Sequence, residues 1–214
     1  MKKLTLIATL MASAMSFSSH AATTSSASVN ITGSIVPSAC AISASANGGT
    51  IDFGKILSSE LGEQGVTRKA KNDTLTITCD KDTTAVVKVS GSNGVDGNTY
   101  NSDKDFVKIA VQFTDVNVTG GNATNKFLVS NAASVDLDNL TAAGFTTAAG
   151  NKPLFPFNGN YLAVADTNNS VGTFKTLTAN YSVSAVVQNA SAKRALTQGE
   201  QTFGGAVTFE LNYL

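Results

Sequence analysis

The sequence has no tryptophan and a single histidine, His20, among its 214 residues. Histidine is the commonest general base of enzymes and a frequent ligand of transition metals. With one histidine, placed close to the N-terminus, a Ser–His–Asp triad or a histidine-rich metal site within a folded domain is excluded. Long apolar runs are missing as well, so the sequence offers no transmembrane helix of about 20 apolar residues.

The N-terminal residues have the composition of a secretory signal peptide. Lys2 and Lys3 give a positive start, Leu4–Phe17 is mostly apolar, and Ala21 is a small residue suited to cleavage. We therefore expect residues 1–21 to be removed on export. The chain from Ala22 would then contain neither histidine nor methionine.

The charge balance gives no reason to expect nucleic acid or an anionic membrane surface as a partner. Without Lys2 and Lys3, the 15 basic residues become 13 against 15 acidic ones, a formal charge of −2. Binding to phosphate backbones or acidic lipids would call for a basic excess. We expect a soluble exported chain with no membrane insertion.

Carboxylates remain the only candidates for catalysis or metal binding. Asp103, Asp105, Asp136 and Asp138 lie among polar residues typical of loops, which favours a solvated surface over an acid pair of the glycosidase kind. The spacing Asn101-x-Asp103-x-Asp105 lacks the turn glycine and the final glutamate of a calcium loop. We expect no enzymatic activity, no cofactor and no metal site.

The two cysteines, Cys40 and Cys79, predict a disulfide bond. An even pair in an exported chain meets an oxidising compartment, where a free thiol is a liability. Two buried free thiols are the alternative. Closing a loop of this size restricts the unfolded chain by about 4 kcal/mol in the entropy model.

The sequence pattern favours antiparallel strands throughout. Apolar and polar residues alternate in four stretches, which predicts half-buried strands at Thr74–Cys79, Val107–Phe113, Tyr181–Val187 and Val207–Tyr213. Glycine–asparagine turn signals separate such stretches, at residues 47–49, 92–94, 120–122 and 158–160. Short strands between turns indicate an all-β, immunoglobulin-like antiparallel β-sandwich.

The middle of the sequence is harder to assign. Residues 134–150 fit a short helix, a strand pair or a loop, and we predict a loop-rich insertion over residues 132–160. Four aromatic residues in loop-like stretches give two interpretations, a weak ligand-binding loop or packing of the insertion onto the sandwich: Tyr100, Phe155, Phe157 and Tyr161.

Both ends of the predicted domain carry strand-like sequence. Near the N-terminus, Val29, Ile31, Gly33 and Ile35 form an apolar row that alternates with polar residues. This row is either the first strand of its own domain or a segment that pairs elsewhere; a glycine in it suits close approach of another backbone. At the other end, Val207, Phe209, Leu211 and Tyr213 lie on a strand after which a sandwich would need one more. We expect the sandwich to be incomplete.

In its order and spacing of motifs, the sequence resembles the chaperone–usher pilins, which are subunits of bacterial fimbriae. The matching residues are Val29-x-Ile31-x-Gly33-x-Ile35, Val36-Pro37-Ser38-Ala39-Cys40, Gly49–Ile56, Leu75–Cys79, Gly204-Gly205 and Tyr213. They cover both ends and the surroundings of the cysteines, whereas residues 95–180 match only as generic β sequence.

The resemblance implies an assembly mechanism and a location. Pilin folds lack their last strand; a periplasmic chaperone fills the gap until the N-terminal segment of the next subunit replaces it. It implies a donor-strand extension at residues 22–36, a pilin domain at residues 37–214, and a groove along Val207–Tyr213 for chaperone or donor. An outer-membrane usher and neighbouring subunits would be partners, in a fimbria on a Gram-negative cell surface that supports adhesion.

Several alternatives stay open at the level of sequence. The subunit could form the shaft or a minor adaptor, in a homopolymer or a mixed one. A stand-alone secreted β-sandwich that binds a carbohydrate or protein is the second interpretation of the whole chain.

Overall fold

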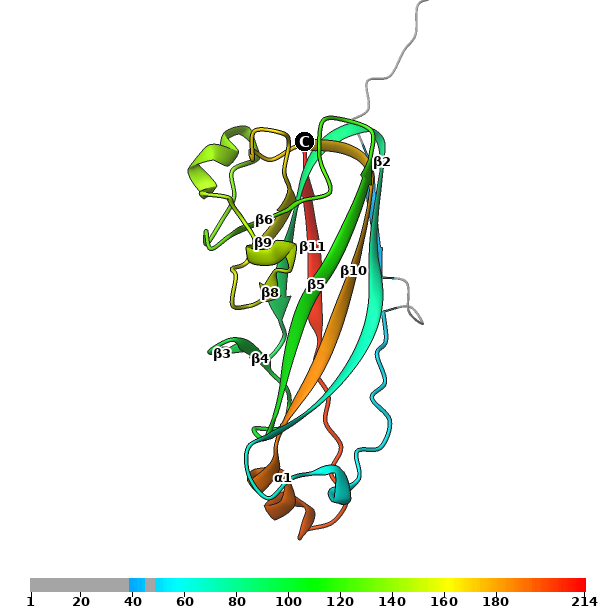
Figure 1. The fold of residues 1–214 in the computed structure, drawn as a ribbon, viewed down its shortest axis with the longest axis vertical. Helices are drawn as coiled ribbons and strands as arrows, with labels where there is room; N and C mark the ends of the chain where they lie inside the picture. Colours follow the sequence, from blue (N-terminus) through cyan, green and yellow to red (C-terminus); the bar gives the residue numbers. More distant parts are fainter. Residues whose placement is uncertain (1–38, 45–48) are drawn as a thin grey trace, which may run out of the picture. The chain divides into compact units, whose positions relative to one another are not determined.

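A computed structural model of the protein describes residues 39–44 and 49–214. The chain divides after Ile35 into two units, and all described residues belong to the second, Val36–Leu214. This unit is an all-β antiparallel sandwich, as the sequence predicts. Its long strands are β2 (Val66–Gly91), β5 (Val107–Thr119) and β10 (Thr173–Gln188), shown in Figure 1.

Strand β2 belongs to both layers of the sandwich. Its first half pairs with β10 on one side and with β1 (Cys40–Ala44) on the other. Its second half pairs with β11 (Val207–Tyr213) and with β9 (Tyr161–Val164). One layer therefore runs β3-β4-β5-β10-β2-β1, and the other runs β11-β2-β9-β6-β7.

Shorter elements complete the two layers. The remaining strands are β3 (Val95–Asp96), β4 (Thr99–Asn101), β6 (Phe127–Ser130), β7 (Thr146–Thr147) and β8 (Leu154–Phe155), the last of which pairs with β5. The helices of the described residues are α1 (Asn189–Leu196) and three short 3₁₀ helices, η1 (Ser58–Glu60), η2 (Leu137–Ala143) and η3 (Ala149–Asn151). Over the described part of the chain, no helix has the length and apolar character needed to cross a membrane.

All four strands predicted from alternation are present. The stretch Thr74–Cys79 lies in β2, where Leu75, Ile77 and Cys79 are buried and the residues between them are more exposed. The other three stretches lie in β5, β10 and β11. The period of two arises because successive side chains of a strand point to opposite faces of the sheet.

An aromatic cluster joins the two layers at the centre of the core. The ring of Phe113 lies 5.6 Å from those of Phe127 and Tyr181, 5.9 Å from Phe155 and 6.0 Å from Phe209, between ring centroids. These residues come from β5, β6, β10, β8 and β11. Each buried aromatic side chain contributes about 1.5–3 kcal/mol relative to leaving it exposed.

The predicted disulfide is confirmed. Cys40 and Cys79 are direct cross-strand partners in the β1–β2 pair, and their sulfur atoms are 2.08 Å apart. The bond ties the first residue of β1 to the middle of β2.

Candidate strand-binding groove

Strand β11 has one paired edge and one open edge. On the paired edge, Ala206 O accepts a hydrogen bond from Ser92 N–H at 2.9 Å, and Leu214 N–H donates to Thr84 O at 3.2 Å. The even-numbered residues of β11 therefore direct their backbone groups toward β2, and those of the odd-numbered residues point the other way. No strand among the described residues pairs with that second edge.

The odd-numbered side chains of β11 face the core but remain partly accessible. Val207, Phe209 and Leu211 pack against the main core cluster, and each is only half-buried. Inward-facing residues at the centre of the sandwich, such as Val111 and Phe113, are fully buried. The core is thus incompletely covered beside β11, on the side of its open edge.

The opposite wall of this opening is the extended segment of residues 50–57. Ile51, Phe53 and Ile56 are half-buried and pack on the core clusters. The segment forms no strand. Its one sharp turn is local: Asp52 Oδ1 accepts from Gly54 N–H at 2.7 Å, and Gly54 has φ +64°, a conformation that favours glycine.

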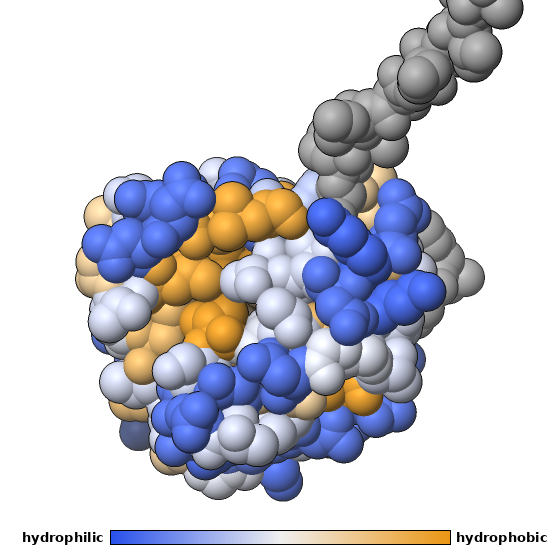
Figure 2. All heavy atoms as spheres, turned by 90° about the horizontal axis from the view of Figure 1, so that it is seen from above, coloured by the Kyte–Doolittle hydropathy of each residue, from blue (hydrophilic) through white to orange (hydrophobic). Residues whose placement is uncertain are grey.

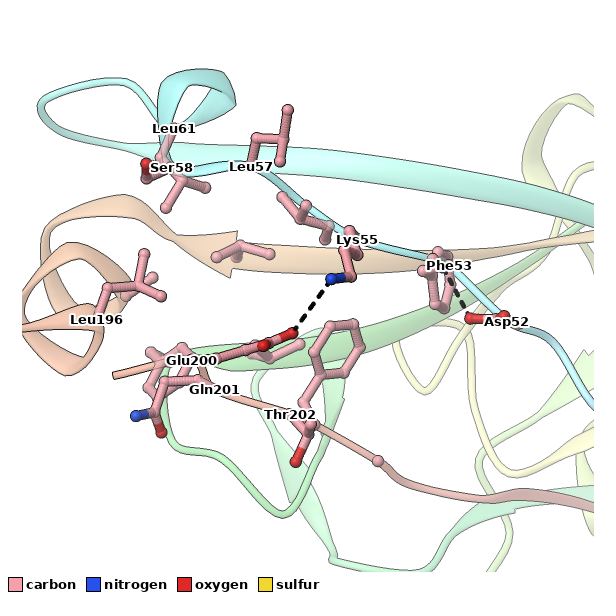
Figure 3. A pocket seen from close by; sticks show the side chains of 18 of the residues that line it. Asp52, Phe53, Lys55, Leu57, Ser58, Leu61, Leu196, Glu200, Gln201 and Thr202 are labelled. Atoms are coloured by element: carbon pink, nitrogen blue, oxygen red, sulfur yellow. Dashed lines mark hydrogen bonds and ion pairs between the residues drawn. The ribbon is translucent and has the colours of Figure 1, made fainter. Parts of the chain in front are cut away.

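A cavity of about 570 Å³ lies between the two walls. One wall consists of residues 51–58, and the other of residues 200–205, which lead into β11. Side chains of β5, β10 and α1 close it from below: Val107, Ile109, Val187, Ala192 and Leu196. Figure 3 shows the two walls facing each other across this space. A concave apolar site bordered by an unpaired strand edge suits an extended peptide.

Two contacts bridge the walls. The rings of Phe53 and Phe203 have centroids 6.1 Å apart, with an interplanar angle of 36°. Lys55 Nζ and Glu200 Oε1 lie 3.9 Å apart, with side chains 81 % and 77 % exposed (Figure 3). The ion pair is well solvated and contributes little, so the aromatic contact is the stronger of the two.

The far end of the 50–57 wall is fixed by Glu60. Its carboxylate forms an ion pair with Lys69 of β2 and accepts a hydrogen bond from Leu57 N–H at 2.8 Å. The hydrogen bond from Lys69, and then that from Leu57 N–H, lower the pKa of the Glu60 carboxyl from its usual value. The wall is therefore anchored just beyond Leu57.

An apolar area is exposed at the end of the domain that carries the C-terminus. Figure 2 shows it between hydrophilic side chains. Strand β11 ends there, with Tyr213 37 % and Leu214 55 % exposed. Tyr213 also has its backbone groups on the open edge, because it is an odd-numbered residue of β11. The predicted groove residues Val207, Phe209, Leu211 and Tyr213 thus share one strand and one open edge.

The weakly predicted ligand loop is not a common exposed surface. Tyr100 lies in β4, Phe155 in β8 and Tyr161 in β9, and all three are buried. Only Phe157 is exposed, at 58 %. Tyr100 and Phe155 pack in the main core cluster, and Tyr161 packs in a smaller cluster with Val86 and Leu128.

The acidic residues singled out in the sequence have structural contacts. Asp103 Oδ1 accepts from Gly204 N–H at 2.7 Å, and Asp136 Oδ1 accepts from Asp138 N–H at 3.0 Å. Within residues 39–44 and 49–214, no three His, Cys, Asp or Glu side chains are grouped so that they could hold a metal ion. No sequence pattern indicates the Asp103–Gly204 contact, which joins residues 101 positions apart.

The predicted donor residues Val29, Ile31, Gly33 and Ile35 lie outside the described residues.

Helix α1, which closes one end of the cavity, was not predicted. Its signal is weak, because only Ala192 is an apolar residue of α1 that is fully buried, and Leu196 is partly exposed.

A family model described as "Protein of unknown function (DUF1120)" matches residues 29–134. No curated protein and no solved structure matches the chain. The matched residues include both cysteines and the 50–57 wall. Strands β10 and β11 lie beyond the match.

Proposed function

We propose that the protein is a structural subunit of a bacterial surface fibre, of the chaperone–usher pilin kind, polymerised by strand donation. The observation that carries the proposal is the open edge of β11, beside a partly uncovered core. An extended segment that paired there would satisfy the outward backbone groups of Val207, Phe209, Leu211 and Tyr213 and cover their side chains.

The proposed occupant is the segment of residues 22–36 of a neighbouring subunit. It carries no charged side chain, which suits an apolar cavity. Its apolar row alternates with polar residues, so one face would meet the groove and the other would meet water. Burial of Val29, Ile31 and Ile35 would contribute roughly 5–9 kcal/mol, at about 1.5–3 kcal/mol each, before ordering costs.

Gly33 suits the part of the groove that aromatic rings occupy. The rings of Phe53 and Phe203 lie there, with their centroids 6.1 Å apart. Gly33 is the one member of the apolar row without a side chain. In the proposed complex, Gly33 therefore passes beside the ring of Phe203, where a larger residue would collide with that ring.

An unpaired edge is also a hazard before assembly, because it invites aggregation. We propose that a periplasmic chaperone covers β11 until the neighbouring subunit arrives, and that an outer-membrane usher receives the subunit for export to the fimbria. A chaperone strand would use the same outward backbone groups of β11. Chaperone and donor would thus compete for one site.

The test compares a chain that starts at Ala22 with one that starts at Pro37. A synthetic peptide of residues 22–36 is added to each, and thermal unfolding is followed by circular dichroism. Peptide at 100 times its Kd should stabilise the shorter chain by about 2.7 kcal/mol, and a scrambled peptide should not.

The same comparison separates the proposal from a stand-alone ligand-binding sandwich. A self-sufficient domain would melt at one temperature with or without residues 22–36 and would ignore the peptide. Equal melting temperatures of the two chains, together with no response to the peptide, would therefore refute strand donation.

A further inference from the structure

We propose that residues 50–57 form a movable strap, closed over the empty groove by the Phe53–Phe203 contact and displaced when the groove is filled. The identity of the occupant rests on the proposed function. The proposal of a strap depends only on two observations: one wall has many more hydrogen bonds than the other, and the two walls contact each other.

The wall that leads into β11 is fixed by hydrogen bonds to Asp103 and Ser92. Gly204 N–H donates to Asp103 Oδ1 at 2.7 Å, and Gly204 O accepts from Asp103 N–H at 2.9 Å. Ala206 O accepts a hydrogen bond from Ser92 N–H at 2.9 Å, and Ala206 N–H donates to Ser92 Oγ at 3.1 Å. Moving this wall would break four hydrogen bonds, and would also disturb the β2–β11 pair that follows.

The strap has no comparable attachment. Between Thr50 and Leu57, its backbone forms no hydrogen bond with any strand among the described residues, and its bonds to Asp52 and Glu60 are local. Apolar side chains hold it: Ile51, Phe53 and Ile56. Packing contacts of this kind can slide or re-form without stranding a backbone polar group. The strap is therefore the wall that moves.

The ring pair joins the movable wall to the fixed one. Phe53 lies on the strap, and Phe203 immediately precedes the anchored Gly204. A strand paired with β11 would lie about 4.8 Å from it, in the space that these rings now span. Filling the groove thus costs the Phe53–Phe203 contact, and the strap moves outward to become the next neighbour of the inserted strand.

The experiment measures the separation of the walls directly. Spin labels are placed on the full exported chain, diluted until it is monomeric, through Lys55→Cys and Glu200→Cys, one on each wall and both well exposed. The native cysteines are oxidised and do not react. Electron paramagnetic resonance then gives the distance distribution in the parent, in Phe203→Ala and in Phe203→Leu. Phe157→Ala, which removes an exposed ring that does not line the cavity, is the matched control.

Without peptide, the parent and the Phe157→Ala control should give one narrow, short distribution. Phe203→Ala should broaden it toward distances longer by about 5 Å, one strand spacing. Phe203→Leu, which keeps apolar bulk and folding but lacks the ring, should lie between them. Distributions in both Phe203 variants that match the parent would overturn the strap.

Added peptide of residues 22–36 should move the parent to the longer distance. It should associate with Phe203→Ala about two- to tenfold faster, the factor expected from losing one aromatic pair. If Phe203→Ala widens the walls but peptide changes no variant, the strap stands and the proposed occupant is wrong. If peptide binds all variants at one rate without widening the walls, strand donation stands and the strap is wrong.

Discussion

Tyr181 and Asp73 are joined by a hydrogen bond in the interior of the sandwich, from the tyrosine Oη to the Asp73 Oδ2 at 2.8 Å. The two residues are direct cross-strand partners in β10 and β2. The ring of Tyr181 lies 5.3 Å from that of Phe209, on the groove side of β11. The Tyr181–Asp73 hydrogen bond between β10 and β2 thus positions the ring of Tyr181, which packs against Phe209 of the open-edged strand β11.

Removing this hydroxyl should weaken the domain without emptying its core. Tyr181→Phe keeps the ring against Phe209 and deletes only the donor to Asp73, so we expect a loss of about 1–3 kcal/mol in the free energy of unfolding. Denaturant titration measures it. Asp73→Ala combined with Tyr181→Phe should cost less than the two single changes added together, since the second loses no partner. Strict additivity would show that the hydroxyl and the carboxyl act independently.

Alkaline pH should destabilise the fold through its buried tyrosines. Burial raises the pKa of Tyr100 to about 12. Burial, and next the Asp73 hydrogen bond, raise that of Tyr181 also. The folded state holds these protons more tightly than the unfolded state, whose tyrosines titrate near 10. The stabilisation is complete below pH 10 and is lost as the pH rises from 10 toward 12.

The variant Tyr100→Phe separates the two contributions. It should cost about 1 kcal/mol at pH 7, because Tyr100 Oη donates to Val89 O at 3.1 Å. The decline in unfolding free energy between pH 10 and 12 should be shallower than in the parent. Equal slopes in both proteins would mean that Tyr100 does not contribute to alkaline unfolding.

The disulfide should account for a large share of the stability. It links residues 39 positions apart, and opening a loop of that size costs about 4 kcal/mol in the chain-entropy model. Cys40→Ala/Cys79→Ala should lower the denaturation midpoint accordingly. Unfolding of the parent under non-reducing conditions is the reference. A loss of less than about 1 kcal/mol in the free energy of unfolding would show that the disulfide is not a main source of stability.

The turn after β5, which lies against the first residue of β10, should tolerate no side chain at Gly121. A Cβ there would lie 2.1 Å from Thr173 O, and φ is +66°. Gly144 has a similar φ of +61° and open space around it, so Gly144→Ala isolates the backbone cost of about 1–2 kcal/mol. Gly121→Ala should exceed that control by at least about 1 kcal/mol, as a clash with backbone forces the turn to shift. Equal melting temperatures for the two variants would contradict this account.

Substitutions in the donor peptide should follow the shape of the groove. In a peptide of residues 22–36, Gly33→Val should abolish the stabilisation of the chain that starts at Pro37, because a branched side chain would meet the ring of Phe203. Asn30→Thr, on the alternate row, should leave the stabilisation within about 0.5 kcal/mol. Calorimetric titration compares the affinities. Equal binding by the Gly33→Val peptide would mean that its register in the groove is different.

Much of the architecture could be predicted from the sequence because each strand has one solvent-exposed face, so that apolar and polar residues alternate along it. Alternation located parts of β2, β5, β10 and β11, and the cysteine pair predicted that Cys40 lies beside Cys79. The strand at Val207–Tyr213 has a recognisable apolar row for the same reason. Where local pattern and long-range pairing agree, the sequence is sufficient.

Local pattern failed where distant contacts decide the structure. The start of β2, from Val66 to Asn72, is polar and largely exposed, and it is a strand because β10 pairs with it along its whole length. Tyr100 looked like a loop residue, yet it lies under the second layer with its hydroxyl bonded to Val89 O. The 50–57 wall has no pattern of its own to show that it faces residues about 150 positions away.

The position of the disulfide has a mechanical consequence. Strand β1 is five residues long, and Cys40, its first residue, is bonded to Cys79. A pull on the backbone ahead of Cys40 therefore reaches β2 through a covalent bond, without unzipping β1 one hydrogen bond at a time. Since β2 is paired with β10 in one layer and β11 in the other, the load is shared by both layers. To fail under tension, the domain must shear long ladders that are loaded all at once.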